Sequence, residues 1–152
     1  MIKLNFPSYS FSIKEENGTQ MIFDEQRKKY VVLTPEEWVR QHLVKYLIHE
    51  KKYPSSLIAV ETSLEVCHQS LRADVVVYHP DRFPLLIAEC KAPTQPINQK
   101  VFDQIAVYNL TLDVRFLVLT NGLLHYCCRV DSDSKKCVFL NSIPDYFTAG
   151  GR

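Results

Sequence analysis

Two mainly apolar runs, residues 71–78 and 85–93, constrain the fold most strongly, because each carries a single carboxylate. Asp74 precedes three valines in the first run, and Glu89 follows four apolar residues in the second. A turn rich in proline and aspartate, at residues 80–84, separates the two runs, so we expect them to pair as neighbouring β-strands. Charged groups are rarely buried in such surroundings without a partner or a metal. The two carboxylates should therefore meet at an edge or bend of the sheet.

Lys91 follows Glu89 by two positions. Strand side chains alternate between faces, so these two should lie on one face and Cys90 on the other. Mg²⁺ prefers oxygen ligands and leaves several positions to water and phosphate. Asp74, Glu89 and the backbone carbonyl of Cys90 would supply a partial shell, while Lys91 would orient or deprotonate an attacking water. The pattern predicts phosphodiester hydrolysis with Mg²⁺, or Mn²⁺ as a substitute. An isolated Glu-x-Lys is otherwise usually a solvated ion pair.

These residues resemble the signature of the PD-(D/E)xK nuclease superfamily, in which an acid on one strand is followed by acid-x-Lys on the next. Asp74 follows Ala73, which stands where the superfamily name has proline, and residues 89–91 match the second part. Gln104 and Tyr108 are similar to the QxxxY element of the RecB-type branch. Their spacing would place both on one face of a helix.

The wider set, which also includes residues 119–122, resembles the N-terminal nuclease domain of type I restriction enzyme restriction subunits and its small stand-alone bacterial relatives. The resemblance covers roughly residues 30–145. It implies an α/β (α+β) fold with a restriction-endonuclease-like αβββαβ core, and a Mg²⁺-dependent DNA endonuclease. The partners that it implies are DNA and other restriction or repair subunits, and homodimer formation stays open. The catalytic residues that it implies are Asp74, Glu89, Lys91, Gln104 and Glu37, and the substrate-binding residues are Arg72, Gln104 and Tyr108.

Glu37 has two explanations. Thr34 and Pro35 predict the start of a helix that runs to about Glu50, with Thr34 as N-cap and Glu37 completing a capping box. In the superfamily, an acid on this helix often completes the metal site. Both alternatives stay open. Glu61 is a further candidate acid, for which a polar residue at a strand bulge is the favoured explanation.

The remaining patterns predict elements around this centre. Asn17 and Gly18 predict the turn of an N-terminal β-hairpin. A helix is expected over about 98–112 and further strands at 57–66, 115–120, 123–129 and 138–140. The predicted domain boundaries are an extension at 1–33, a nuclease domain at 34–145 and a tail at 146–152.

The net charge of +1 does not by itself indicate a polyanion partner, so DNA binding would depend on local basic runs such as residues 27–29, 51–52 and 135–136. No run of eighteen apolar residues and no signal-peptide pattern is visible, which predicts a cytoplasmic protein without membrane attachment. No segment with an evident role in target selection accompanies the motifs. A catalytically inactive module that binds nucleic acid or protein on the same fold is therefore the alternative function.

Overall fold

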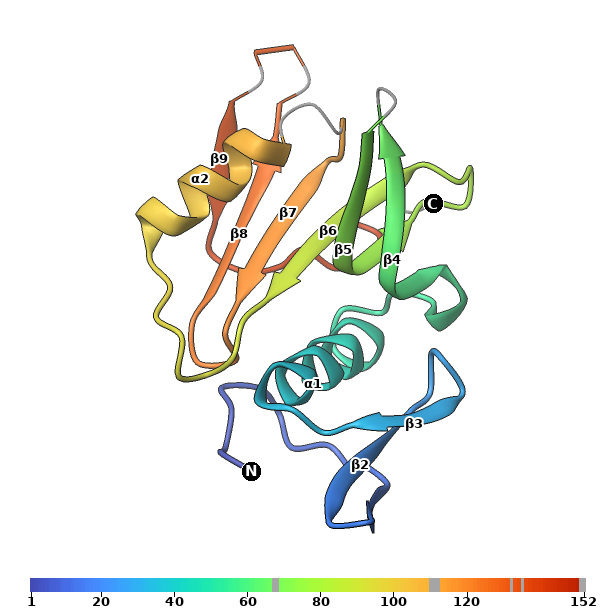
Figure 1. Ribbon diagram of the computed structural model, residues 1–152. Helices are drawn as coiled ribbons and strands as arrows, with labels where there is room; N and C mark the ends of the chain where they lie inside the picture. Colours follow the sequence, from blue (N-terminus) through green and yellow to red (C-terminus); the bar gives the residue numbers. More distant parts are fainter. Residues whose placement is uncertain (67–68, 110–112, 132, 135, 151–152) are drawn as a thin grey trace.

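The computed structural model describes residues 1–66, 69–109, 113–131, 133–134 and 136–150, apart from the side chains of residues 66, 69, 71 and 107–109 (Figure 1). Within this part of the chain, three strands form an N-terminal antiparallel sheet and six strands form a mixed sheet. The elements are β1 (Ile13–Glu16), β2 (Thr19–Asp24), β3 (Lys29–Val32), α1 (Pro35–His49), a 3₁₀ turn (Ser55–Leu57), β4 (Ile58–Val66), β5 (Gln69–Tyr78), β6 (Pro84–Cys90), α2 (Gln99–Asn109), β7 (Phe116–Thr120), β8 (His125–Val130) and β9 (Cys137–Leu140).

The six-stranded sheet has the order β4-β5-β6-β7-β8-β9 and is antiparallel except for the central β6–β7 pair. One buried cluster joins one face of the sheet to α1, and a second joins the other face to α2. Figure 1 shows α1 between this sheet and the N-terminal sheet. The predicted α+β fold, with a mixed sheet flanked by helices, is confirmed. No helix in the described ranges is long and apolar enough to cross a membrane.

The N-terminal hairpin forms around the predicted turn. Asn17 and Gly18 have φ values of 53° and 79°, the left-handed conformation that a tight two-residue hairpin turn requires. The hairpin pattern did not reveal β3, which pairs antiparallel with β2 from Met21–Val32 to Asp24–Lys29. The turn between β2 and β3 lies close to the start of α1, because Arg27 within it pairs with Glu37.

The first helix begins where its sequence predicts. The Thr34 side chain accepts a hydrogen bond from the backbone N–H of Glu37, and Pro35 occupies the first turn. Val39, Leu43 and Leu47 are fully buried against the six-stranded sheet. The helix also buries polar side chains, Glu37, Arg40, Gln41 and His42, because it lies between two sheets.

The centre of the mixed sheet is formed by β5, β6 and β7, whose apolar runs are almost completely buried. In the parallel pair, Glu89 lies opposite Leu119, and the backbone N–H of Lys91 donates to the carbonyl of Thr120 at 2.8 Å. The following turn packs tightly, since a Cβ at Gly122 would lie 2.7 Å from a methyl carbon of Leu4. The hydrogen bond to Thr120 ties the end of β6, from which Lys91 emerges, to the end of β7.

The buried His42 should make stability depend on pH. Burial lowers the pKa of its imidazole from the ordinary 6.5, although a hydrogen bond to the carbonyl of Trp38 opposes the shift. The folded state therefore binds fewer protons than the unfolded chain once the pH falls below about 6.5, so stability is retained above that pH and lost below it. We expect the urea midpoint to fall between pH 7.5 and 5.5. His42→Gln should reduce this fall, whereas His49→Gln, at an exposed position of the same helix, should leave it unchanged.

Candidate active site

Adjacent strands bring Asp74 and Glu89 together. The β5–β6 ladder runs to the pair Val75–Ala88; Asp74 immediately precedes Val75 on β5, and Glu89 immediately follows Ala88 on β6. The backbone N–H of Cys90 donates to Oδ2 of Asp74 at 2.7 Å. The Asp74 side chain is thus tied to the end of β6, and it is half-buried with 21% of its side chain exposed. The two acids therefore lie side by side at the end of a buried strand.

Glu89 and Lys91 form an ion pair on one side of this strand end. Their Oε1 and Nζ atoms are 3.0 Å apart, and the side chains are 39% and 27% exposed. Cys90, between them, is buried in the core against α1. The pair remains accessible to solvent and to any bound molecule.

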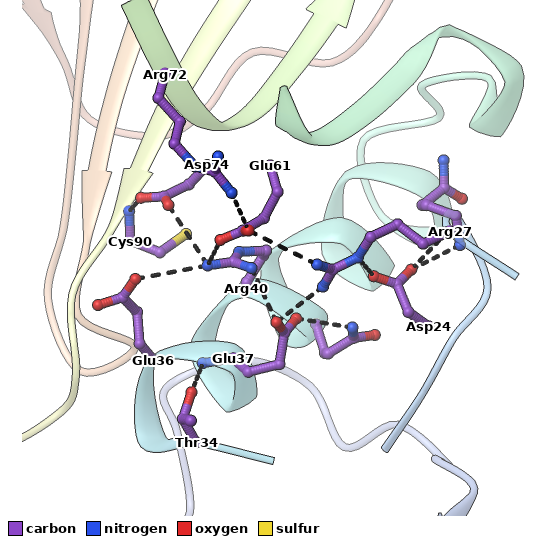
Figure 2. A network of polar contacts seen from close by, with 12 residues as sticks. Asp24, Arg27, Thr34, Glu36, Glu37, Arg40, Glu61, Arg72, Asp74 and Cys90 are labelled. Atoms are coloured by element: carbon purple, nitrogen blue, oxygen red, sulfur yellow. Dashed lines mark hydrogen bonds and ion pairs between the residues drawn. The ribbon is translucent and has the colours of Figure 1, made fainter. Parts of the chain in front are cut away.

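Glu36 and Glu37 are consecutive on α1 but have different surroundings. Glu36 is 47% exposed, and its Oε1 lies 3.5 Å from Nη2 of Arg40. Glu37 is buried, and its carboxylate accepts hydrogen bonds from Arg27, Arg40 and Gln41 at 2.8–2.9 Å. The Glu37 carboxylate thus points to neither of the two places considered for it, its own helix end and the Asp74 site. Glu36, which the motif analysis did not select, is the helix acid on the side of Asp74 (Figure 2).

Arg40 lies at the centre of the polar network in Figure 2. Its Nη1 is 2.8 Å from Glu37, and its Nη2 is 3.0 Å from Glu61 and 3.5 Å from Oδ1 of Asp74. Glu61 also accepts a hydrogen bond from Arg72, whose side chain is 68% exposed. Glu61, the other candidate acid, is therefore engaged by arginines in a strand position with φ of 47°.

The charged groups of the site alter one another's pKa values. Burial raises the pKa of the Asp74 carboxyl, and the charges of Glu36 and Glu89 act in the same direction, while Cys90 N–H and Arg40 oppose the rise. The hydrogen bond to Glu89 raises the pKa of Lys91 despite its partial burial, with Asp74 and Glu36 contributing. Lys91 is therefore held as an ammonium. The charges of Glu36 and Glu89 thus act on Asp74, and the charges of all three carboxylates act on Lys91.

The site and the network behind it carry an excess of negative charge. Six carboxylates face only four cationic side chains, which leaves a formal charge of −2. The carboxylates are Asp24, Glu36, Glu37, Glu61, Asp74 and Glu89, and the cations are Arg27, Arg40, Arg72 and Lys91. A divalent cation would balance this charge.

The donor set suits a hard cation. Among the described residues, no group of three or more His, Cys, Asp or Glu side chains stands ready to hold a metal ion. Mg²⁺ nevertheless needs only one or two protein carboxylates, because water and phosphate complete its shell. Asp74 and Glu89 supply such oxygens at a solvent-accessible strand end, with Glu36 nearby. The chemistry of these side chains therefore fits Mg²⁺ or Mn²⁺.

A family comparison agrees with this arrangement. The sequence profile described as "Type I restriction enzyme R protein N terminus" matches residues 35–144. The chain belongs to this family. No curated protein sequence matches the chain. The matched range contains α1 and the whole six-stranded sheet, whereas β1, β2 and β3 precede it.

Solved structures share the fold of this restriction-enzyme R-protein domain. One similar structure, from Vibrio vulnificus YJ016, is described as a fragment of an HsdR subunit of a type I restriction enzyme. It has a TM-score of 0.54 and 19% identity, and the match covers 78% of this chain. The chain spans only 25% of the length of that structure. A protein from Anabaena variabilis ATCC 29413, described as a nuclease belonging to DUF820, has a TM-score of 0.51 and 12% identity, with 90% of this chain and 87% of that chain covered. The chain therefore has a nuclease-like fold.

Of the other residues predicted for the site of the R-protein domain, some make no contact with Asp74 or Glu89 among the described residues, and the side chain of one lies outside the described part of the chain. Gln104 is exposed on α2, and no contact joins it to Asp74 or Glu89 in the described part of the chain. The side chain of Tyr108 lies outside the described residues, so the pairing of these two remains a prediction. In the described part of the chain, Arg72 reaches the network only through Glu61. Arg27, expected within an exposed basic run, instead points into the network with only 20% of its side chain exposed.

Replacing Asp74 should separate its effect on metal binding from its effect on the stability of the R-protein domain. Because burial raises the pKa of this carboxyl, its ionised form opposes folding at neutral pH, and asparagine would remove that charge while still accepting from Cys90. We expect Asp74→Asn to abolish Mn²⁺ binding by calorimetry without lowering the thermal midpoint at pH 7. A fall of more than about 4 °C, equivalent to about 1 kcal/mol or more at this chain length, would contradict this account.

Proposed function

We propose that this domain is a Mg²⁺-dependent DNA endonuclease that hydrolyses phosphodiester bonds. The observation that carries the proposal is that the Asp74 carboxylate accepts a hydrogen bond from the backbone of Cys90, between Glu89 and Lys91, which form a partly exposed ion pair. Two carboxylates and an ammonium in this arrangement suit a metal and a scissile phosphate together. Membership of the R-protein N-terminal family supports the same reaction class.

The proposed roles follow from the surroundings of each side chain. Asp74, Glu89 and the carbonyl of Cys90 would hold the metal, which supplies Lewis-acid stabilisation of the phosphate and a more acidic water. Lys91 is an ammonium, so it would donate hydrogen bonds to a phosphate oxygen and offset the charge that develops there. Glu36 would accept a hydrogen bond from metal-bound water or complete the shell.

DNA is the proposed substrate, and further restriction subunits are the proposed partners. Arg72 is the most exposed of the four cations in the network, and it would contact a backbone phosphate after leaving Glu61. Gln104 and Tyr108 would support the substrate if α2 lies along the bound strand. Purified protein that neither binds Mn²⁺ nor cuts DNA, while still binding nucleic acid or another subunit, would instead favour the inactive binding module on this fold.

Lys91 should be essential for cleavage if this proposal holds. Without its ammonium, the charge that develops on the phosphate loses one donor, so we expect Lys91→Ala to reduce Mn²⁺-dependent cleavage of plasmid DNA by about 10²-fold or more. Lys14→Ala, in the exposed N-terminal hairpin, provides the matched control. Cleavage by Lys91→Ala at the wild-type rate would refute the role.

The consecutive acids Glu36 and Glu37 provide a second test. Glu36→Gln should weaken Mn²⁺ binding with little change in stability, because Glu36 is half-exposed beside Asp74. Glu37→Gln should instead lower the free energy of unfolding by about 2–3 kcal/mol, because buried Arg40 and Arg27 lose a charged partner. Urea unfolding and calorimetry distinguish the two. The reverse pattern would assign the metal-site acid to Glu37.

A further inference from the structure

Arg40 pairs less closely with Asp74 than with two other carboxylates. Its closest contacts are Glu37 at 2.8 Å and Glu61 at 3.0 Å, whereas Oδ1 of Asp74 is 3.5 Å away. The arginine side chain is only 4% exposed, and its Nε has no hydrogen-bond partner in the described residues. The two Nη groups alone therefore fix the orientation of the guanidinium.

The Asp74 carboxylate is consequently held from two directions. Oδ2 accepts from the backbone of Cys90 at 2.7 Å, and Oδ1 faces Arg40 at a distance too long for a tight ion pair. Such a contact directs Oδ1 but leaves its lone pairs able to reach a metal. A flat guanidinium held at both nitrogens can do this, whereas a lysine ammonium cannot span Glu37 and Glu61 in the same way.

The anchors of Arg40 are in turn held by the N-terminal sheet. Arg27, in the turn between β2 and β3, donates to Glu37 at 2.8 Å and has a guanidinium nitrogen 3.9 Å from Glu61. Arg27 is itself fixed by Asp24, which is buried and also accepts from the backbone N–H groups of Gln26 and Arg27. Figure 2 shows this row of alternating charges running from Asp24 to Asp74.

The backbone of β4 also contributes to the arrangement. Glu61 has φ of 47° and lies between the ladder pairs Val60–Val75 and Thr62–Ala73, opposite the position of Asp74. A left-handed conformation at a residue other than glycine is costly and persists only when its surroundings hold it. Here Arg40 and Arg72 hold the Glu61 carboxylate. The strained backbone conformation thus places Glu61 where it can anchor Arg40.

We propose that Arg40 is a positioning residue that aims the Asp74 carboxylate for the divalent cation, and that the β2–β3 turn maintains this geometry through Arg27. The inference rests on the proposed function. It assigns to the N-terminal sheet, which precedes the matched family range of 35–144, a part in forming the metal site. The N-terminal residues are then more than an extension that packs on the core.

The test compares arginine-to-lysine variants, which keep the positive charge but replace the planar guanidinium and its several N–H donors with an ammonium. Calorimetry with Mn²⁺ alone should give a Kd about tenfold higher for Arg40→Lys, as expected when a residue that orients a metal ligand is changed, and about threefold higher for Arg27→Lys. Arg129→Lys, at an exposed position on β8, should bind Mn²⁺ as the wild type does. In cleavage assays, the Mn²⁺ concentration for half-maximal rate should rise in the same order, with most of the rate recovered at saturating Mn²⁺.

The outcomes separate the inference from the proposed function. A wild-type protein that binds no Mn²⁺ would overturn both. Wild-type Mn²⁺ binding that persists unchanged in folded Arg40→Lys and Arg27→Lys would overturn the positioning role alone, even if both variants were less stable. If Arg40→Lys does not fold, Arg27→Lys decides the question, because the more exposed Arg27 contacts Asp24 and the anchors Glu37 and Glu61 but, among the described residues, not Asp74 itself.

Discussion

The burial of the Arg40 guanidinium between α1 and the end of the six-stranded sheet is the constraint on which the site depends. A buried cation is tolerated only when carboxylates surround it, since the loss of hydration must be offset. Its partners come from three elements: Glu36 and Glu37 on α1, Glu61 on β4 and Asp74 on β5. Satisfying one side chain therefore fixes the helix relative to two strands.

The charges divide into an inner and an outer group. The inner group, which includes Glu37 and Arg40, is buried and joined by short hydrogen bonds, so it holds the framework. The outer group of Glu36, Asp74, Glu89 and Lys91 remains partly exposed. A turn of about 100° per residue on a helix separates the adjacent acids Glu36 and Glu37 into these two groups. The inner charges can thus orient the outer ones without competing directly for a substrate.

Local patterns were sufficient to predict much of this structure. Alternation along residues 85–91 predicted that Glu89 and Lys91 share a face, and the Asn17-Gly18 and Thr34-Pro35 pairs predicted a turn and a helix start; all three agree with the structure. The choice between Glu36 and Glu37 could not be made in this way. It depends on how α1 is rotated against the sheet, which tertiary packing decides.

The network around Arg40 was equally beyond the sequence patterns. Its members lie on five segments between residues 24 and 74, and no spacing rule connects the members on different segments. β3 also escaped prediction, because its four residues carry little periodicity. Arg27 and Arg40 each follow an acid by three positions, which indicated local ion pairs. This spacing did not indicate which acids on other segments each arginine would contact.

The parallel β6–β7 pair has a consequence for the order of assembly. It joins Glu89 to Leu119 across thirty positions, whereas two to six residues separate β4 from β5, β5 from β6, β7 from β8 and β8 from β9 along the chain. Closing the longer loop carries the larger entropic cost and should come later. We expect α1 with β4–β6 to consolidate first, so that the carboxylates of the site converge before the second half of the sheet docks. Defects in β7–β9 would then leave the acids gathered on an incomplete sheet, exposed along the edge of β6.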